Sequence, residues 1–139
     1  MEQMLVPLRR YADFQGRSSR SEYWMFALGI VILYALMAGL LALVVAGMPR
    51  GGGTMAVVYL LYAVFAIVLL GLIVPSIAVQ VRRLHDQDKT GWLVLIGLIP
   101  YLGGIVVLVL MCLPGTKGPN KFGPDPLDPT GAQVAGIFR

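Results

Sequence analysis

The chain has 139 residues, of which 58% are hydrophobic and 13% charged, and its net charge is +4. Soluble globular proteins contain about 45–50% apolar residues, so this composition predicts one small membrane domain and argues against a soluble fold. The positive charge does not indicate nucleic-acid binding, because the basic residues flank apolar runs and form no continuous basic face.

Three long stretches contain no charged residue: 23–49, 51–81 and 90–116, of 27, 31 and 27 residues. Each is longer than the roughly 20 apolar residues with which a helix crosses a bilayer. Backbone polar groups in hydrocarbon must be paired inside the protein, so these runs are expected to be helical. We therefore predict an all-α membrane protein with a transmembrane domain at 20–113, a small bundle of three transmembrane helices at about 22–47, 55–79 and 92–113.

An N-terminal interfacial segment, residues 1–19, precedes the first span. Apolar and basic side chains are mixed in residues 4–14, which suits a short helix at headgroup level, although Pro7 weakens this pattern. Ser19 and Glu22 have the spacing of a capping box, in which the serine accepts from a backbone N–H and the glutamate reaches back. The first helix is expected to begin near Arg20.

Aromatic and small residues in and beside the apolar runs predict where the helices contact the membrane interface or one another. Tyr23 and Trp24, with Trp92 before the third run, are expected to anchor the chain at the membrane interface. A stripe of small residues predicts a helix-packing face, within the chain or in a homo-oligomer: Ala35, Ala38, Gly39, Ala42 and Ala46. The aromatic stripe Tyr59, Tyr62 and Phe65 predicts core packing, and Pro75 predicts a kink after Gly71.

The third apolar run is interrupted at Pro100–Gly104 and allows two structures. One is a single span broken at Pro100; the other is a re-entrant hairpin, which gives four helical pieces and returns the tail to the side of its origin. The length of the run favours the single span, which we expect, whereas Lys117 and Lys121 favour the hairpin. Residues 114–139 form a Gly/Pro-rich tail, expected to consist of turns and to be disordered beyond about 128.

The distribution of lysine and arginine predicts the orientation. Only Arg50 lies in the first loop, and the N-terminal segment and residues 82–89 carry most of the others. By the positive-inside rule we expect a multi-pass inner-membrane protein with a cytoplasmic N-terminus.

Two polar clusters, residues 14–24 and 82–92, should therefore meet on the cytoplasmic side. Arginine forks match phosphate oxygens, which points to an anion or an anionic lipid headgroup; Glu22 and Asp86 could instead satisfy the arginines in a structural network that ties the two spans together. The residues concerned in either case are Arg17, Arg20, Glu22, Arg82, Arg83, His85 and Asp86.

Neither cluster has the pattern of a catalytic or metal site. His85 is the only histidine and Cys112 the only cysteine, and no nucleophile or second metal ligand stands at a recognisable spacing. We expect no enzyme activity and no cofactor.

Three motifs resemble the signatures of the domain-of-unknown-function 805 family. They are Phe14-x-Gly16-Arg17-x-x-Arg20-x-Glu22-Tyr23-Trp24, then Arg83-Leu84-His85-Asp86 with Gly91-Trp92, then Pro114-Gly115-x-x-Gly118-x-Asn120-x-Phe122-Gly123. The resemblance implies a small bacterial inner-membrane protein of a few transmembrane helices, without an established activity. Leu93 stands where many members have a second aromatic residue.

The sequence thus predicts a non-enzymatic integral membrane protein whose cytoplasmic face engages anionic lipid or a protein partner. The alternative is a subunit of a small oligomeric transporter or channel. That alternative is weaker because the three spans contain no ionisable side chain, the usual mark of a polar substrate path.

Overall fold

The computed structural model describes residues 2–47 and 51–128, and the elements that it forms in these ranges are helices, as expected. Apart from an isolated bridge between Asn120 and Gly123, the described ranges contain no β-structure. In chain order the elements are α1 (Glu2–Arg9), α2 (Arg20–Gly47), α3 (Gly52–Asp86), the 3₁₀ helix η1 (Gly91–Leu98) and α4 (Leu102–Cys112).

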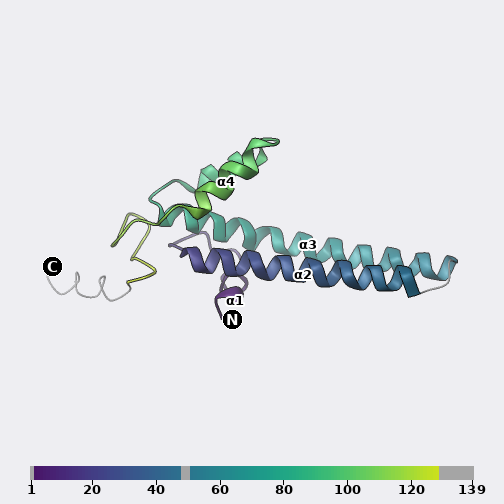
Figure 1. The fold of residues 1–139 in the computed structure, drawn as a ribbon. Coiled ribbons are helices and arrows are strands. Elements are labelled where there is room, and N and C mark those ends of the chain that lie inside the picture. The colour runs from purple at the N-terminus through teal and green to yellow at the C-terminus, as the bar shows by residue number, and fades with distance from the viewer. Residues whose placement is uncertain (1, 48–50, 129–139) are drawn as a thin grey trace.

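Helices α2 and α3 form a long antiparallel pair (Figure 1). With 28 and 35 residues at about 1.5 Å per residue, each is longer than the roughly 30 Å hydrocarbon core of a bilayer. Among the described residues, these two helices alone are long and apolar enough to cross a membrane. Their large side chains point outward, with Leu43 and Ile67 72% and 70% exposed. An apolar exterior of this extent is typical of a surface that contacts lipid or another protein chain.

The third apolar run is broken near Pro100, as expected, and its two pieces, η1 and α4, pack against each other as in the hairpin alternative. Tyr101 adopts a left-handed backbone conformation (φ 65°) between η1 and α4, and the chain reverses there. Gly103 makes the reversal close, because a Cβ at this position would overlap the carbonyl oxygen of Ile96. At about 2.0 and 1.5 Å per residue, η1 and α4 are each about 16 Å long, roughly half of a bilayer core.

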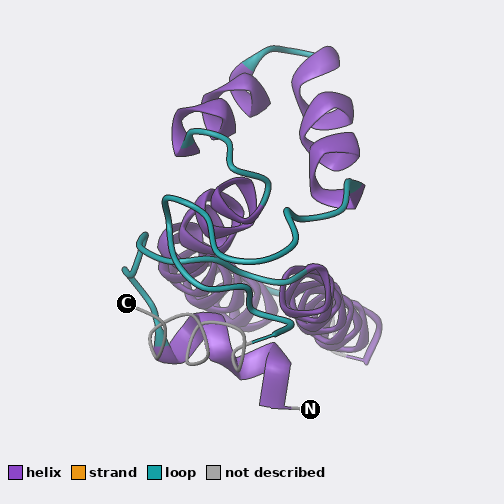
Figure 2. Cartoon of the chain, turned by 90° about the vertical axis from the view of Figure 1, so that its left-hand side faces the viewer, coloured by secondary structure: helices purple, strands orange, loops and turns teal. Residues whose placement is uncertain are grey.

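The hairpin and α1 lie on opposite sides of the α2–α3 pair (Figures 1 and 2). The N-terminal segment is helical despite Pro7, whose side chain is fully buried, and α1 packs against both long helices. Helix α3 continues beyond residue 79, through its charged last turn to Asp86. The disorder expected beyond 128 lies outside the described residues.

Most residues of the small-residue and aromatic stripes are exposed, whereas Phe65 is half-buried. Ala35, Gly39, Ala42 and Ala46 are exposed on α2, and the Tyr59 and Tyr62 side chains on α3 are 70% and 55% exposed, so the expected core packing of these tyrosines is wrong. Lipid contact accounts for such exposure, since lipid tails are as apolar as a protein core. Oligomerisation through the small-residue stripe stays a prediction.

Helix α3 runs through Pro75 without interruption. Proline has no N–H, so the carbonyl of Gly71, four residues earlier, lacks its helical donor. The hydroxyl of Tyr11, in the segment after α1, donates to this carbonyl at 2.6 Å. The N-terminal segment is thereby attached to α3 at the one carbonyl that the proline leaves open.

Replacing Tyr11 with Phe should lower the thermal stability of the purified protein in detergent, by about 1 kcal/mol for one hydrogen bond. In a Pro75→Ala background the backbone regains an N–H that can reach the Gly71 carbonyl, so the same replacement should then cost less. Melting curves of the four proteins of this double-mutant cycle measure the coupling. An equal loss in both backgrounds would contradict the link between Tyr11 and Pro75.

Candidate functional site

Three polar segments meet at the end of the molecule where α2 begins and α3 ends: residues 10–19, the last turn of α3 and the tail after α4 (Figure 1). Helix α2 starts at Arg20, as the capping box predicted, with the Glu22 N–H donating to Ser19 Oγ at 3.2 Å. The Glu22 carboxylate does not complete the box; it pairs with Arg82 instead. The cap therefore fixes the start of α2 and leaves Glu22 for a contact with α3.

The Asp86 carboxylate is the centre of this end of the molecule. Arg17 Nε donates to one carboxylate oxygen at 2.9 Å, and Arg83 donates to the other. All three side chains are at most 6% exposed. A buried charge is tolerated only when it is paired and hydrogen-bonded, so each of these groups depends on the other two.

The same two arginines hold the tail through backbone carbonyls. Arg17 donates to the carbonyls of Thr116 and Gly118 at 2.5 and 2.6 Å, and Arg83 donates to that of Leu113. The Thr116 N–H donates in turn to the Asp86 carbonyl at 2.8 Å. The end of the hairpin is thus bound to the end of α3, which is why the chain after α4 returns to this side.

Arg82, also in the last part of α3, forms a separate ion pair with Glu22 of α2. Its guanidinium lies 3.3 Å from the Glu22 carboxylate and is fully buried. Its three nitrogens have no hydrogen-bond partner of acceptable geometry among the described residues. The Ser18 N–H donates to the Arg82 carbonyl at 3.1 Å, which attaches the segment before α2 to α3.

His85 belongs to the contact between α3 and the tail. Its ring stacks on Phe122, with centroids 3.8 Å apart and 4° between the planes. Nδ1 lies 3.3 Å from the Gly16 carbonyl, and the Asn120 side-chain amide donates to the His85 carbonyl at 2.9 Å. The adjacent Asp86 carboxylate is engaged by arginines, so no described contact makes it an orienting group for the imidazole.

The glycines and aromatic residues of the predicted motifs are found at close backbone approaches, at turns and at the protein surface. A Cβ at Gly115 would overlap the Asp86 carboxylate, and one at Gly91 would lie 2.7 Å from Val81 Cγ1, so both glycines allow close approach. Gly16, Gly118 and Gly123 have positive φ. Of the expected anchors, Tyr23 and Trp24 make an edge-to-face pair at 5.4 Å, and Trp92 is 77% exposed.

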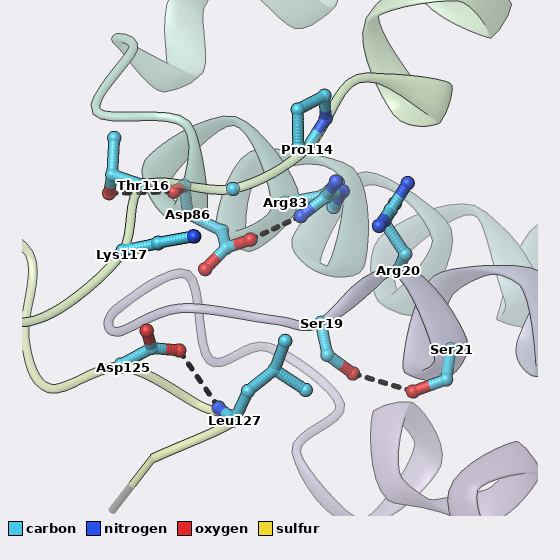
Figure 3. Close-up of a pocket in the computed structure, with 11 residues that line it drawn as sticks. Ser19, Arg20, Ser21, Arg83, Asp86, Pro114, Thr116, Lys117, Asp125 and Leu127 are labelled. Carbon is cyan, nitrogen blue, oxygen red and sulfur yellow. Dashed lines mark hydrogen bonds and ion pairs between the residues drawn. The ribbon is translucent and has the colours of Figure 1, made fainter.

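Arg20 and Lys117 stand apart from the network. Both are exposed and make no ion pair within residues 2–47 and 51–128. With Arg83 they line a cavity of about 360 Å³ between the start of α2 and the tail (Figure 3). The other lining residues are Ser19, Ser21, Asp86, Pro114, Gly115, Thr116, Asp125 and Leu127.

Asp125, at the rim of this cavity, is satisfied within the tail. The backbone N–H of Leu127 and that of Gly118 donate to its carboxylate at 2.9 and 3.0 Å. These bonds, the first being the stronger effect, lower the pKa of Asp125 below its ordinary value. Among the described residues, no group of three or more His, Cys, Asp or Glu side chains could hold a metal.

Sequence reasoning missed three residues that contribute here. Thr116 acts through its backbone and through its hydroxyl, which donates to the Asp86 carbonyl at 3.1 Å. Asp125 acts by accepting from backbone N–H groups of the tail. Neither role was singled out from the sequence. Tyr11 had a partial signal, because the carbonyl freed by Pro75 requires a donor. Which side chain would supply it depends on the packing of α1.

The fold and this polar end define a small helical membrane protein. The family described as "Protein of unknown function (DUF805)" matches residues 11–124, and the chain belongs to it. Two relatives from Escherichia coli K12 are "Inner membrane protein YhaH", 40% identical, and "Inner membrane protein YhaI", 36% identical. Each match covers 91% of this chain, with 97% and 96% of the respective relative. No solved structure matches.

Removing the Asp86 charge should destabilise the protein strongly. Asp86→Asn leaves Arg17 and Arg83 buried without a carboxylate, a loss of about 3–5 kcal/mol. Arg20→Ala, in an exposed residue outside the network, should change stability by no more than about 0.5 kcal/mol. Thermal melting in detergent compares the two variants; similar melting temperatures would refute the central role of Asp86.

A methyl group at Gly115 should also be destabilising. Gly115→Ala places a Cβ against the Asp86 carboxylate and must displace it or the tail. Gly104→Ala, in α4 with no heavy atom within 4 Å of the added Cβ, is the matched control and should be neutral or stabilising by up to about 1 kcal/mol. Limited proteolysis of the tail and melting curves should separate them, and equal behaviour would contradict the close approach.

Proposed function

We propose that this protein is an inner-membrane protein that binds the phosphate of an anionic lipid headgroup at the cavity between the start of α2 and the tail. The observation that carries the proposal is the presence of Arg20, Arg83 and Lys117 around one cavity, two of them without a carboxylate partner in the described ranges. Guanidinium and ammonium groups are the side chains that bind phosphate in proteins.

The carboxylates of the cavity do not pair with Arg20 or Lys117, and the single charge of Asp86 is shared between two arginines. Asp86 is engaged by Arg17 and Arg83, and Asp125 accepts from backbone N–H groups. Arg83 is fully buried, and its Nε has no hydrogen-bond partner among the described residues. A phosphate would thus meet positive charge that the protein itself leaves available.

The start of α2 adds backbone donors. The N–H groups of Glu22 and Tyr23 are bonded to Ser19, whereas those of Arg20 and Ser21, also at the cavity, have no partner among the described residues. Free N–H groups and the positive end of the helix dipole favour an anion at this place.

The position of the cavity suits a headgroup better than a solute path. It lies where two apolar helices end, at headgroup depth if α2 and α3 cross the membrane. The hairpin places Lys117 and Lys121 at the same end as the other basic residues, which supports a cytoplasmic orientation for this end and a chain that crosses the membrane twice. No contact in the described ranges favours a transporter.

Native mass spectrometry of the detergent-solubilised protein with equal amounts of phosphatidylglycerol and phosphatidylcholine tests this function. We expect preferential retention of phosphatidylglycerol. Replacing Arg20 and Lys117 together with Gln should weaken that preference by roughly fivefold for each charge. Lys121→Gln, which removes an exposed charge outside the cavity, is the control and should keep it.

Addition of millimolar inorganic phosphate separates a lipid site from a site for a free anion. A lipid site should retain phosphatidylglycerol, whereas displacement by phosphate would assign the cavity to a soluble anion. Equal retention of the two lipids by the unmodified protein would refute the proposed function.

A further inference from the structure

We propose that a second recess, the apolar groove between α3, η1 and the tail, binds a lipid that ends in a hydroxyl group, such as a diacylglycerol or a long-chain alcohol. The hydroxyl donates to Nε2 of His85, and the hydrocarbon chain lies along the apolar face of α3. This inference is independent of the proposed headgroup site, because the two recesses share no lining residue.

The groove has the size and lining of a small-molecule site. Its volume is about 490 Å³, within the roughly 300–1,000 Å³ typical of ligand pockets. Its walls are mainly apolar, and the side chains with polar groups are His85, Thr90 and Trp92, of which Trp92 carries a donor only. The lining residues are Phe14, Ile77, Val81, His85, Thr90, Gly91, Trp92, Val94, Leu95 and Phe122.

The contacts of His85 determine what its free nitrogen can do. A carbonyl oxygen only accepts, so Nδ1, 3.3 Å from the Gly16 carbonyl, carries the proton of that contact. In the neutral ring, Nε2 is then an acceptor. It has no hydrogen-bond partner among the described residues, and the stack on Phe122 fixes the plane of the ring. The groove therefore offers a fixed acceptor to a ligand that carries a donor.

Gly91 keeps this nitrogen accessible. A Cβ at this position would lie 3.3 Å from Nε2, between the ring and η1. Any larger side chain would cover the acceptor and fill the groove. Glycine at position 91 thus serves two purposes: it leaves Nε2 of His85 accessible, and it allows η1 to approach Val81 closely.

One end of the groove is polar and the other is apolar, which matches an amphipathic ligand. His85 and Ile77 lie on the same side of α3 and are separated by eight residues, or about 12 Å. Ile77 belongs to the apolar part of α3, and His85 to its polar end. A chain held along Ile77 and Leu95 would lie in the hydrocarbon, with its hydroxyl at the level of the polar network.

Trp92, exposed at the edge of the groove, supplies the test. The chain has two tryptophans, so Trp24→Phe leaves Trp92 as the only one. In this background, brominated octadecanol and its brominated methyl ether are titrated into detergent micelles, and quenching of Trp92 is followed against probe mole fraction. We expect saturable quenching by the alcohol at a roughly two- to tenfold lower mole fraction than by the ether, which cannot donate.

Two variants separate the hydrogen bond from the groove. His85→Phe retains an aromatic ring against Phe122 and should reduce the alcohol to the behaviour of the ether. Leu95→Phe narrows the groove and should weaken both probes, whereas Leu60→Phe, exposed elsewhere on α3, should weaken neither. Quenching that never saturates, that does not distinguish alcohol from ether, or that neither His85→Phe nor Leu95→Phe changes would overturn the proposal.

Discussion

The structure depends on one buried carboxylate. Asp86, at the end of α3, lies between Arg17 from the segment before α2 and Arg83 from its own helix, and these arginines also hold the carbonyls of the tail. Three segments distant in sequence are thereby joined at a point from which water is largely excluded. Removal of water strengthens each of these charged hydrogen bonds and makes each unpaired group costly, so the contacts form together.

This dependence follows from the surroundings of the two long helices. In lipid, burying apolar side chains between helices gains little, because lipid tails are as apolar as the side chains. The outer parts of α2 and α3 are accordingly exposed, and the buried core of the described residues is concentrated near the polar end, with Ala78, Val79, Leu84 and Met111 beside the arginines. Polar contacts at the membrane interface, together with α1 and the hairpin, therefore hold the two helices in place.

The hairpin turns a polar end into two recesses of different chemistry. One is lined by Arg20, Arg83 and Lys117, and the other by apolar side chains around His85. Both exist because the tail returns to α3: Thr116 and Lys117 form part of the first wall and Phe122 part of the second. Both proposed ligands, a phosphate and a hydroxyl-bearing chain, would therefore bind at sites that form only when the tail packs against α3.

The sequence by itself determined the membrane class, the helical content, the start of α2 and the residues of the polar end, because charge-free runs, a capping serine and clustered arginines act locally. It did not determine the path of residues 92–113. Run length alone favours a span, and the hairpin is decided by the left-handed turn at Tyr101 and by Arg83 binding the Leu113 carbonyl, a contact between residues 30 apart. Nor could it separate Arg17, which is buried on Asp86, from Arg20, which is exposed at the cavity, because three residues of spacing do not specify which guanidinium reaches a carboxylate on another helix. Only the packing of the tail against α3 makes that distinction.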